Sequence, residues 1–292
     1  MSGTKYFYLA EKKEGRDESA TREEARNRFL SFNGSDLGGA AWGGASWYRR
    51  PFKDAGLIRH KADKLLFFIG SDPTDAENLH AEFRLRIEND LLTLTHTCVV
   101  FIPAGVAHGE LEAVRADRPV FAYNSLIGAG VYSEEAAEAV APAGRYAHQV
   151  VERYEPLNGK LPDAPAGFLT LLLWLDGKKL PGAPYTEAVW FNQCNDTGPA
   201  PHAHEFDEFI GFIGSDPAHP EELNAELQFY IDDEAVTITK SCLVFIPRGV
   251  RHSPILVPRM ERPLIHFSGG VGGAYERVGA IENTNIFKPG TV

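Results

Sequence analysis

The hydrophobic pattern along the chain is that of short strands separated by turns. In the second half, the runs Ala225–Ile231 (AELQFYI), Ala235–Lys240 (AVTITK) and Cys242–Pro247 (CLVFIP) are rich in β-branched and aromatic residues. Glycine, proline and aspartate lie between such runs, where the chain has to turn. Several short runs bounded by turn residues predict an all-β sandwich or barrel.

The same pattern occurs twice. FIGSDP is found at Phe68 and again at Phe212, and VFIPAGVAH at Val100 returns as VFIPRGVRH at Val244, each 144 residues later. Residues 60–108 aligned with 204–252 give 23 identities in 49 positions without a gap. A repeat of this length predicts two copies of one structural unit.

Each repeat is long enough to bury its own core, so we expect two domains, residues 1–148 and 149–292. The predicted fold class is all-β, with two similar sandwiches or barrels in tandem and a few short helices. The helices are expected outside the repeated core, at Asp17–Phe29 and Glu134–Val140.

Composition excludes several classes of function. The net charge is −11, and no stripe of lysine and arginine is present to neutralise phosphates, so no nucleic-acid partner is expected. The most apolar run, Phe168–Leu175, has eight residues against the roughly 20 of a membrane span. The N-terminal sequence has no apolar signal region, and the three cysteines have no CxxC spacing. We therefore expect a cytoplasmic protein without a membrane partner.

Three histidines and a glutamate of the second half are candidate metal ligands. His202 and His204 alternate along the chain and can face the same side of a strand, and Glu208 keeps the same parity. His252 arrives from another strand, after a turn shaped by Pro247 and Gly249. Three imidazoles and one carboxylate suit one divalent ion of Fe, Mn, Ni, Co or Zn and leave room for a small-molecule ligand.

These residues resemble the two sequence motifs of the cupin superfamily, HxHx(3,4)E and PxGx2H. Both motifs are present in the second half, in order, on a duplicated chain, so the resemblance implies a bicupin of two jelly-roll barrels. The stretches HEFDEFxGFxGSDP and TKSCLVFIPxGxxH are most similar to uncharacterised bacterial cupin-domain proteins. One departure is Ser241, which stands where the motif-two pattern has a glycine.

The first half has lost part of this set. Subtraction of 144 maps two of the histidines onto His60 and His108, but His202 becomes Ile58 and Glu208 becomes Lys64. An ammonium has no lone pair to offer a metal, so we expect no metal there. Two interpretations remain open for these positions. They are either a relic that supports the fold or an anion pocket in which Lys64, with Arg49 or Arg50, replaces the charge of the metal.

His266 is a candidate catalytic residue. It lies in the strand-like run PLIHFS after the last predicted ligand, and its counterpart in the first half is Ala122. If it faces the pocket it could transfer protons near neutral pH or support a ligand, and it could equally face solvent. Asp207 and Cys242 recur as Asp63 and Cys98, which favours a structural role for both.

The resemblance implies a metal-dependent enzyme acting on a small, oxygen-rich and anionic organic substrate. Dioxygenase, decarboxylase, isomerase and lyase chemistry all remain open. The alternatives are a non-catalytic bicupin that binds a small ligand with the help of its metal, and a structural, seed-storage-like bicupin. A homodimer is expected, because open barrel edges need covering.

Overall fold

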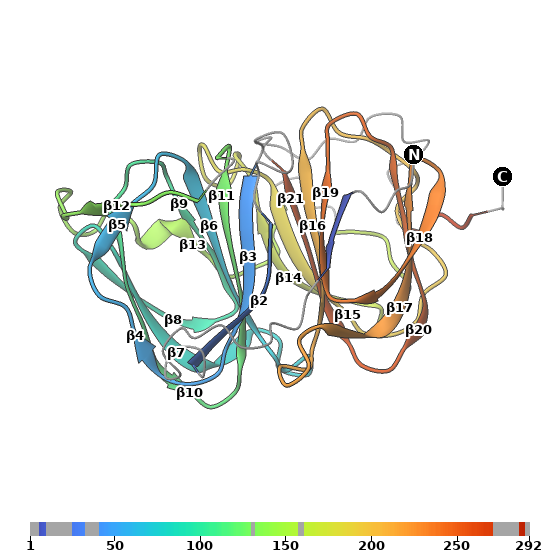
Figure 1. Cartoon of the computed structure of the whole chain (residues 1–292), viewed down its shortest axis with the longest axis horizontal. Coiled ribbons are helices and arrows are strands. Elements are labelled where there is room, and N and C mark those ends of the chain that lie inside the picture. Colours follow the sequence, from blue (N-terminus) through green and yellow to red (C-terminus); the bar gives the residue numbers. More distant parts are fainter. Residues whose placement is uncertain are drawn as a thin grey trace. The chain divides into compact units, whose positions relative to one another are not determined.

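The computed structural model describes residues 6–9, 25–32, 41–129, 132–156, 161–270 and 286–289. The chain divides into two compact units, each built from antiparallel strands (Figure 1). Residues 11–153 form one unit, the first barrel, and residues 1–10 together with 154–292 form the other, the second barrel.

Two sheets make up the described part of the first barrel. The larger has the strand order β13 (Val150–Val151), β9 (Cys98–Ile102), β6 (Asp63–Gly70), β11 (Val120–Ile127), β3 (Ala41–Tyr48) and β2 (Arg26–Phe32). The other has the order β12 (Glu135–Ala137), β5 (Leu57–Arg59), β10 (His108–Ala116), β7 (Asn78–Ile87) and β8 (Asp90–His96), and β4 (Phe52–Lys53) also pairs with β10. A 3-10 turn, η3 (Ala147–Gln149), precedes β13.

The described part of the second barrel repeats this plan. Its larger sheet has the order β1 (Phe7–Leu9), β19 (Cys242–Ile246), β16 (Glu208–Gly214), β21 (Leu264–Gly270), β15 (Thr186–Phe191) and β14 (Leu169–Leu175). Its smaller sheet has the order β18 (Glu234–Lys240), β17 (Glu222–Ile231) and β20 (His252–Met260).

The 144-residue repeat predicted from the sequence is also a structural repeat. Strands β7 to β10 recur 144 residues later as β17 to β20 with identical bounds. Between β3 and β15 the offset is one residue shorter, because Trp47 lies opposite Phe121 whereas Trp190 lies opposite Ile265. The two tryptophans therefore occupy equivalent positions, 143 residues apart.

The glycine of FIGSDP is required by a close approach of two strands. A Cβ atom on Gly214 would lie 2.0 Å from the carbonyl oxygen of Glu222, and one on Gly70 would lie 2.2 Å from that of Asn78. Real Cβ atoms are not found so close to a backbone oxygen. Both glycines lie against a backbone carbonyl at equivalent positions of the two barrels. The motif is therefore repeated because the same close packing occurs in each barrel.

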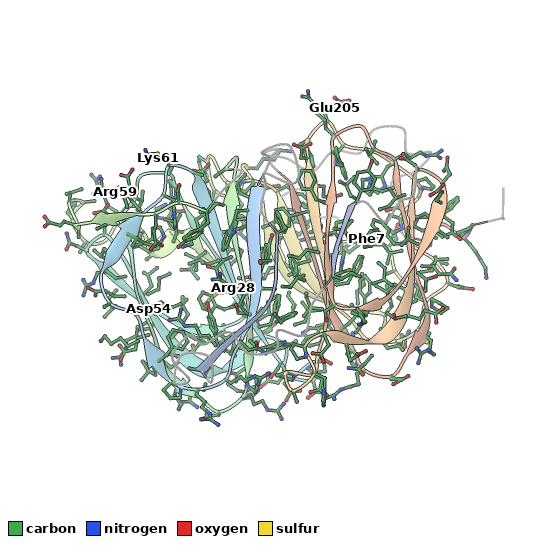
Figure 2. The ribbon with its side chains drawn as sticks, viewed as in Figure 1. Phe7, Arg28, Asp54, Arg59, Lys61 and Glu205 are labelled. Atoms are coloured by element: carbon green, nitrogen blue, oxygen red, sulfur yellow. The ribbon has the colours of Figure 1, made fainter. Side chains whose placement is uncertain are left out.

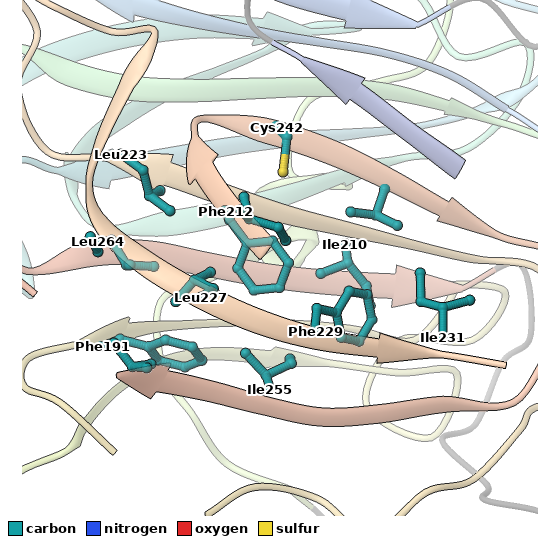
Figure 3. Close-up of a cluster of buried hydrophobic side chains, with 14 of the residues drawn as sticks. Phe191, Ile210, Phe212, Leu223, Leu227, Phe229, Ile231, Cys242, Ile255 and Leu264 are labelled. Atoms are coloured by element: carbon teal, nitrogen blue, oxygen red, sulfur yellow. The ribbon is translucent and has the colours of Figure 1, made fainter. Parts of the chain in front are cut away.

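The core of each barrel lies between its sheets, where the inward side chains of both meet (Figure 2). In β17 the buried residues are every second one, including Leu227, Phe229 and Ile231, as expected for a strand with one face inward. They pack against Phe212 of the larger sheet (Figure 3). Burial of each such large side chain stabilises the fold by roughly 1.5–3 kcal/mol.

The edge strands β13 and β1 occupy equivalent places in the two barrels. Val150 pairs with Val100 of β9, and Phe7 pairs with Val244 of β19. The ring of Phe7 also packs edge-on against Phe229, with the ring centroids 6.4 Å apart (Figure 2). The first residues of the chain thus complete the edge of the second barrel.

One predicted helix is wrong, and the other falls partly outside the described residues. Within Glu134–Val140, the strand β12 forms instead, with Ala136 opposite Ile58 of β5. Pairing with an otherwise open sheet edge overrides the helix propensity of its alanines and glutamates. In Asp17–Phe29, the residues from Arg26 onward form β2, and residues 17–24 lie outside the described part. Among the described residues, no helix is long and apolar enough to cross a membrane.

Candidate metal centre

The two histidine-bearing segments of the second barrel are joined by backbone hydrogen bonds. The His202 N–H donates to the His252 carbonyl (3.0 Å) and the His252 N–H donates to the His202 carbonyl (2.8 Å). This reciprocal pair sets the two rings side by side, with centroids 4.6 Å apart. Gly249, at φ +78°, makes the turn before β20 and donates its N–H to the His204 carbonyl (2.8 Å). Backbone hydrogen bonds therefore hold the two motifs together.

Glu208, the first residue of β16, brings its carboxylate to the histidines. Its Oε2 lies 3.0 Å from Nε2 of His252 and 3.6 Å from Nε2 of His204. All four predicted ligands are buried, with 2–4% of their surfaces exposed. The donor nitrogens of His202, His204 and His252 lie within 4.8 Å of one another. The structure thus brings together the four residues that the sequence singled out.

The orientation of two imidazoles fits metal ligation. Nδ1 of His202 lies 2.7 Å from the Ala200 carbonyl oxygen, and Nδ1 of His252 lies 3.0 Å from that of Val250. Because a carbonyl only accepts, each Nδ1 carries the proton and each Nε2 carries a lone pair. A backbone carbonyl on the outer nitrogen is the arrangement that orients histidine ligands in metal sites.

The spacing of the donors also fits one ion. Ligands bound at about 2.1 Å and separated by 90–109° around a metal are roughly 3.0–3.4 Å apart. The distances from the Glu208 carboxylate to the two nearest imidazoles are 3.0 and 3.6 Å. Burial alone would raise the pKa of Glu208, but the neighbouring imidazoles, His252 foremost, lower it below its usual value. The carboxyl is therefore present as the anionic ligand a cation needs.

A cavity of about 440 Å³ opens onto this cluster within the second barrel. His202, Glu208 and His252 line it, together with inward residues of β14, β15, β16 and β21. Strand register orders the wall in rows: Ile210 lies opposite Ser268, which lies opposite Glu187. One row further from Glu208, Phe212 lies opposite His266, which lies opposite Val189.

His266 lines the same cavity and is 7% exposed, so it faces the pocket and not the solvent. It is sandwiched between two rings, with centroids 4.8 Å from Phe191 and 5.0 Å from Phe212. Its Nδ1 lies 3.2 Å from the Gly211 carbonyl oxygen, which leaves the lone pair on Nε2. Burial lowers the pKa of His266 to about 4, so the ring is neutral at neutral pH and acts as a hydrogen-bond acceptor.

In the first barrel an ammonium group takes the place corresponding to the metal cluster. Nζ of Lys64 lies 3.1 Å from Nε2 of His60 and 3.2 Å from Nε2 of His108. The His60 and His108 rings are 5.1 Å apart at 43°, almost the geometry of His204 and His252 at 5.2 Å and 47°. Of the two interpretations left open by the sequence, this contact favours a structural one, because the ammonium donates to the residual histidines.

Burial governs the titration of this triad. It lowers the pKa of Lys64 to about 8, although the carboxylates of Glu134 and Asp54 favour the ammonium form. Burial and the Lys64 charge together lower the pKa of His108 to about 3, and they lower that of His60 as well. At neutral pH the lysine is therefore the charged donor and both imidazoles are neutral acceptors.

The residues shared by both barrels have structural roles. Oδ1 of Asp63 accepts the N–H of Ala104 (2.8 Å), and Oδ1 of Asp207 accepts the N–H of Arg248 (2.9 Å). Ser241, the departure from the motif-two pattern, accepts the N–H of Gly214 on its Oγ (3.0 Å). It thereby secures the strand that carries Glu208.

Some residues of the cavity were not found by sequence reasoning. They include Phe168, Glu187, Phe191, Asn195 and Ser253. Glu187 and Phe191 share the inward parity of β15, so alternation along that strand could have indicated them. Asn195 and Ser253 lie outside any alternating run, and the sequence carries no signal for them.

No family model and no curated protein matches the chain. Solved structures are similar. Oxalate decarboxylase from Bacillus subtilis at pH 4.6 matches with a TM-score of 0.56 over 86% of this chain and 73% of that one, at 10% identity. AerE from Microcystis aeruginosa matches with a TM-score of 0.51 over 91% of this chain and 98% of that one, at 11% identity. The fold is that of tandem cupin barrels, and the predicted fold class is confirmed.

Proposed function

We propose that the second barrel is the active unit of a metal-dependent enzyme that acts on a small, oxygen-rich organic substrate. The observation that carries this proposal is the convergence of His202, His204, Glu208 and His252 beside a cavity, three of them lining it. The structural likeness to an oxalate decarboxylase supports a carboxylate or related oxygen ligand as substrate. Dioxygenase, decarboxylase, isomerase and lyase reactions are all compatible with this site.

The four ligands would hold one divalent ion. When bound, such an ion supplies positive charge that polarises a chelated carbonyl or carboxylate. The protein's own contribution is orientation and exclusion of water, since the imidazoles are fixed by Ala200 and Val250 and the cluster is buried. In a site of low dielectric, charges fixed in advance count for more than they do in water.

His266 is proposed as the group that exchanges a proton or hydrogen bond with the substrate. Its Nε2 carries a lone pair, and its Nδ1 is held by the Gly211 carbonyl. It lies four residues along β21 from Gly270, which is opposite Glu208. At about 3.3 Å per residue that is roughly 13 Å of strand, so His266 is suited to the end of the substrate away from the metal.

Elemental analysis of the purified chain tests the metal site. A stoichiometry near one per chain is expected, and His204→Ala should abolish most of it. His219→Ala, which removes a histidine of the turn between β16 and β17, is the matched control and should keep the metal. A ratio near two, or metal retained by His204→Ala, would contradict the assignment.

A turnover screen on the metal-loaded chain separates an enzyme from a binding protein. Release of chemically changed product supports the enzyme. Recovery of a bound organic ligand unchanged from every reaction would instead favour the non-catalytic bicupin.

A further inference from the structure

Resting on the proposed function, we infer that the substrate of the second barrel is a monoanion that chelates the metal through two oxygens and carries an apolar, planar body. A small dianion with charge at both ends, such as oxalate, would leave most of this cavity unfilled and is the poorer match. Three observations lead to this substrate class, namely the size of the cavity, the nature of its walls and the distribution of charge along it.

The cavity is larger than a small dicarboxylate needs. Its volume of about 440 Å³ lies within the roughly 300–1,000 Å³ of pockets that enclose drug-sized ligands, whereas one water takes about 30 Å³ of liquid. A molecule of six non-hydrogen atoms bound at the metal would leave most of this space to be filled by something else.

Much of the wall away from the metal is apolar and aromatic. Phe168 and Phe191 line the cavity with ring centroids 4.7 Å apart, and Phe191 continues onto His266 at 4.8 Å. Trp174 contributes a further ring and Ile255 an aliphatic surface. Aromatic walls favour a flat apolar group, because stacked and edge-on ring pairs gain more than area burial alone.

Charge along the cavity favours a single negative group on the ligand. A divalent ion beside Glu208 leaves one net positive charge, which one carboxylate or enolate neutralises. Beyond it, the charged groups among the described lining residues are the carboxylates of Asp163 and Glu187, and no lysine or arginine of the described part lines the cavity. A second carboxylate on the substrate would therefore face like charge in a partly desolvated space.

The test compares three probes with the same two-carbon chelating unit on the metal-loaded full chain. Pyruvate carries a methyl group, benzoylformate a phenyl ring and oxalate a second charge. Calorimetric titration should show that benzoylformate binds at least ~10-fold more tightly than either of the others, since a buried ring is worth a kilocalorie or more. Phe168→Leu should reduce this preference without changing pyruvate affinity or metal content.

Glu187→Gln gives a second variant that keeps the side-chain shape and can still accept the hydrogen bond from Oη of Tyr154 (2.7 Å in the wild type). It should tighten oxalate binding about 3-fold or more and leave benzoylformate unchanged. Oxalate binding most tightly to the wild type, benzoylformate no better than pyruvate, or no binding of any probe to the metal-loaded chain would overturn the inference while the metal site stands. A purified chain without metal would instead overturn the proposed function itself, and the substrate class with it.

Discussion

Lys64→Met in the first barrel gives a quantitative test of the buried ammonium. The lysine donates to His60 and His108 and is 8% exposed. Burial lowers its pKa from 10.5 to about 8. The charged form is therefore less favourable in the folded than in the unfolded chain, by about 3 kcal/mol for a shift of this size.

The pH dependence of the free energy of unfolding follows from the lowered pKa of Lys64. Below pH 8 both states hold the proton, and the full cost of burying the charge opposes folding. Between pH 8 and 10.5 the unfolded chain binds more protons than the folded one, so the free energy of unfolding contributed by Lys64 rises with pH. From pH 7 to pH 9.5 the gain is about 2 kcal/mol. Both imidazoles are neutral throughout this window, because their pKa values are lowered.

Urea unfolding of wild type and Lys64→Met at each pH measures this contribution, since other titrating groups cancel in the difference. The wild type should gain about 2 kcal/mol relative to the variant by pH 9.5. Lys61→Met is the matched control, because Lys61 is 84% exposed and its substitution should leave the difference flat. A flat difference for Lys64→Met as well would refute the idea of a desolvated ammonium.

Three further outcomes are expected. The double substitution Ile58→His with Lys64→Glu should restore a second metal site and raise the metal content from one to two per chain by elemental analysis, and Ile58→His alone should leave it at one. Gly214→Ala should lower the free energy of unfolding by about 3 kcal/mol or more, because its Cβ would meet a backbone oxygen at 2.0 Å. Gly182→Ala, with open space at φ +86°, should cost only about 1–2 kcal/mol in denaturant titrations. His266→Ala should reduce kcat about 10²–10⁴-fold on a substrate from the turnover screen with metal content intact; unchanged kcat would remove His266 from the mechanism.

The sequence was most informative where the fold repeats itself. The 144-residue register predicted the equivalence of the two barrels, and the same register holds for Gly70 and Gly214 and for strands β7 to β10 against β17 to β20. The sequence also grouped the four candidate metal ligands, because alternation along a strand and the turn at Gly249 determine which way their side chains point.

Features set by long-range pairing or by burial could not be predicted. The helix expected at Glu134–Val140 became a strand because an edge of β5 was available to it. The contact of Lys64 with both histidines depends on the distance between β6 and β10, which no local pattern encodes. The low pKa of His266 follows from its place between Phe191 and Phe212.

The pairing of β1 with β19 has a consequence for the order in which the protein matures during synthesis. Residues 11–153 form a unit that is contiguous in the chain, so the ribosome delivers all its parts before the second repeat is made. Phe7, in contrast, is translated before the first barrel, and its partner Val244 is translated more than two hundred residues later. Strand β1 therefore cannot form this pairing until β19 has been translated. This gives that barrel a higher contact order, and we expect it to be the slower of the two to fold.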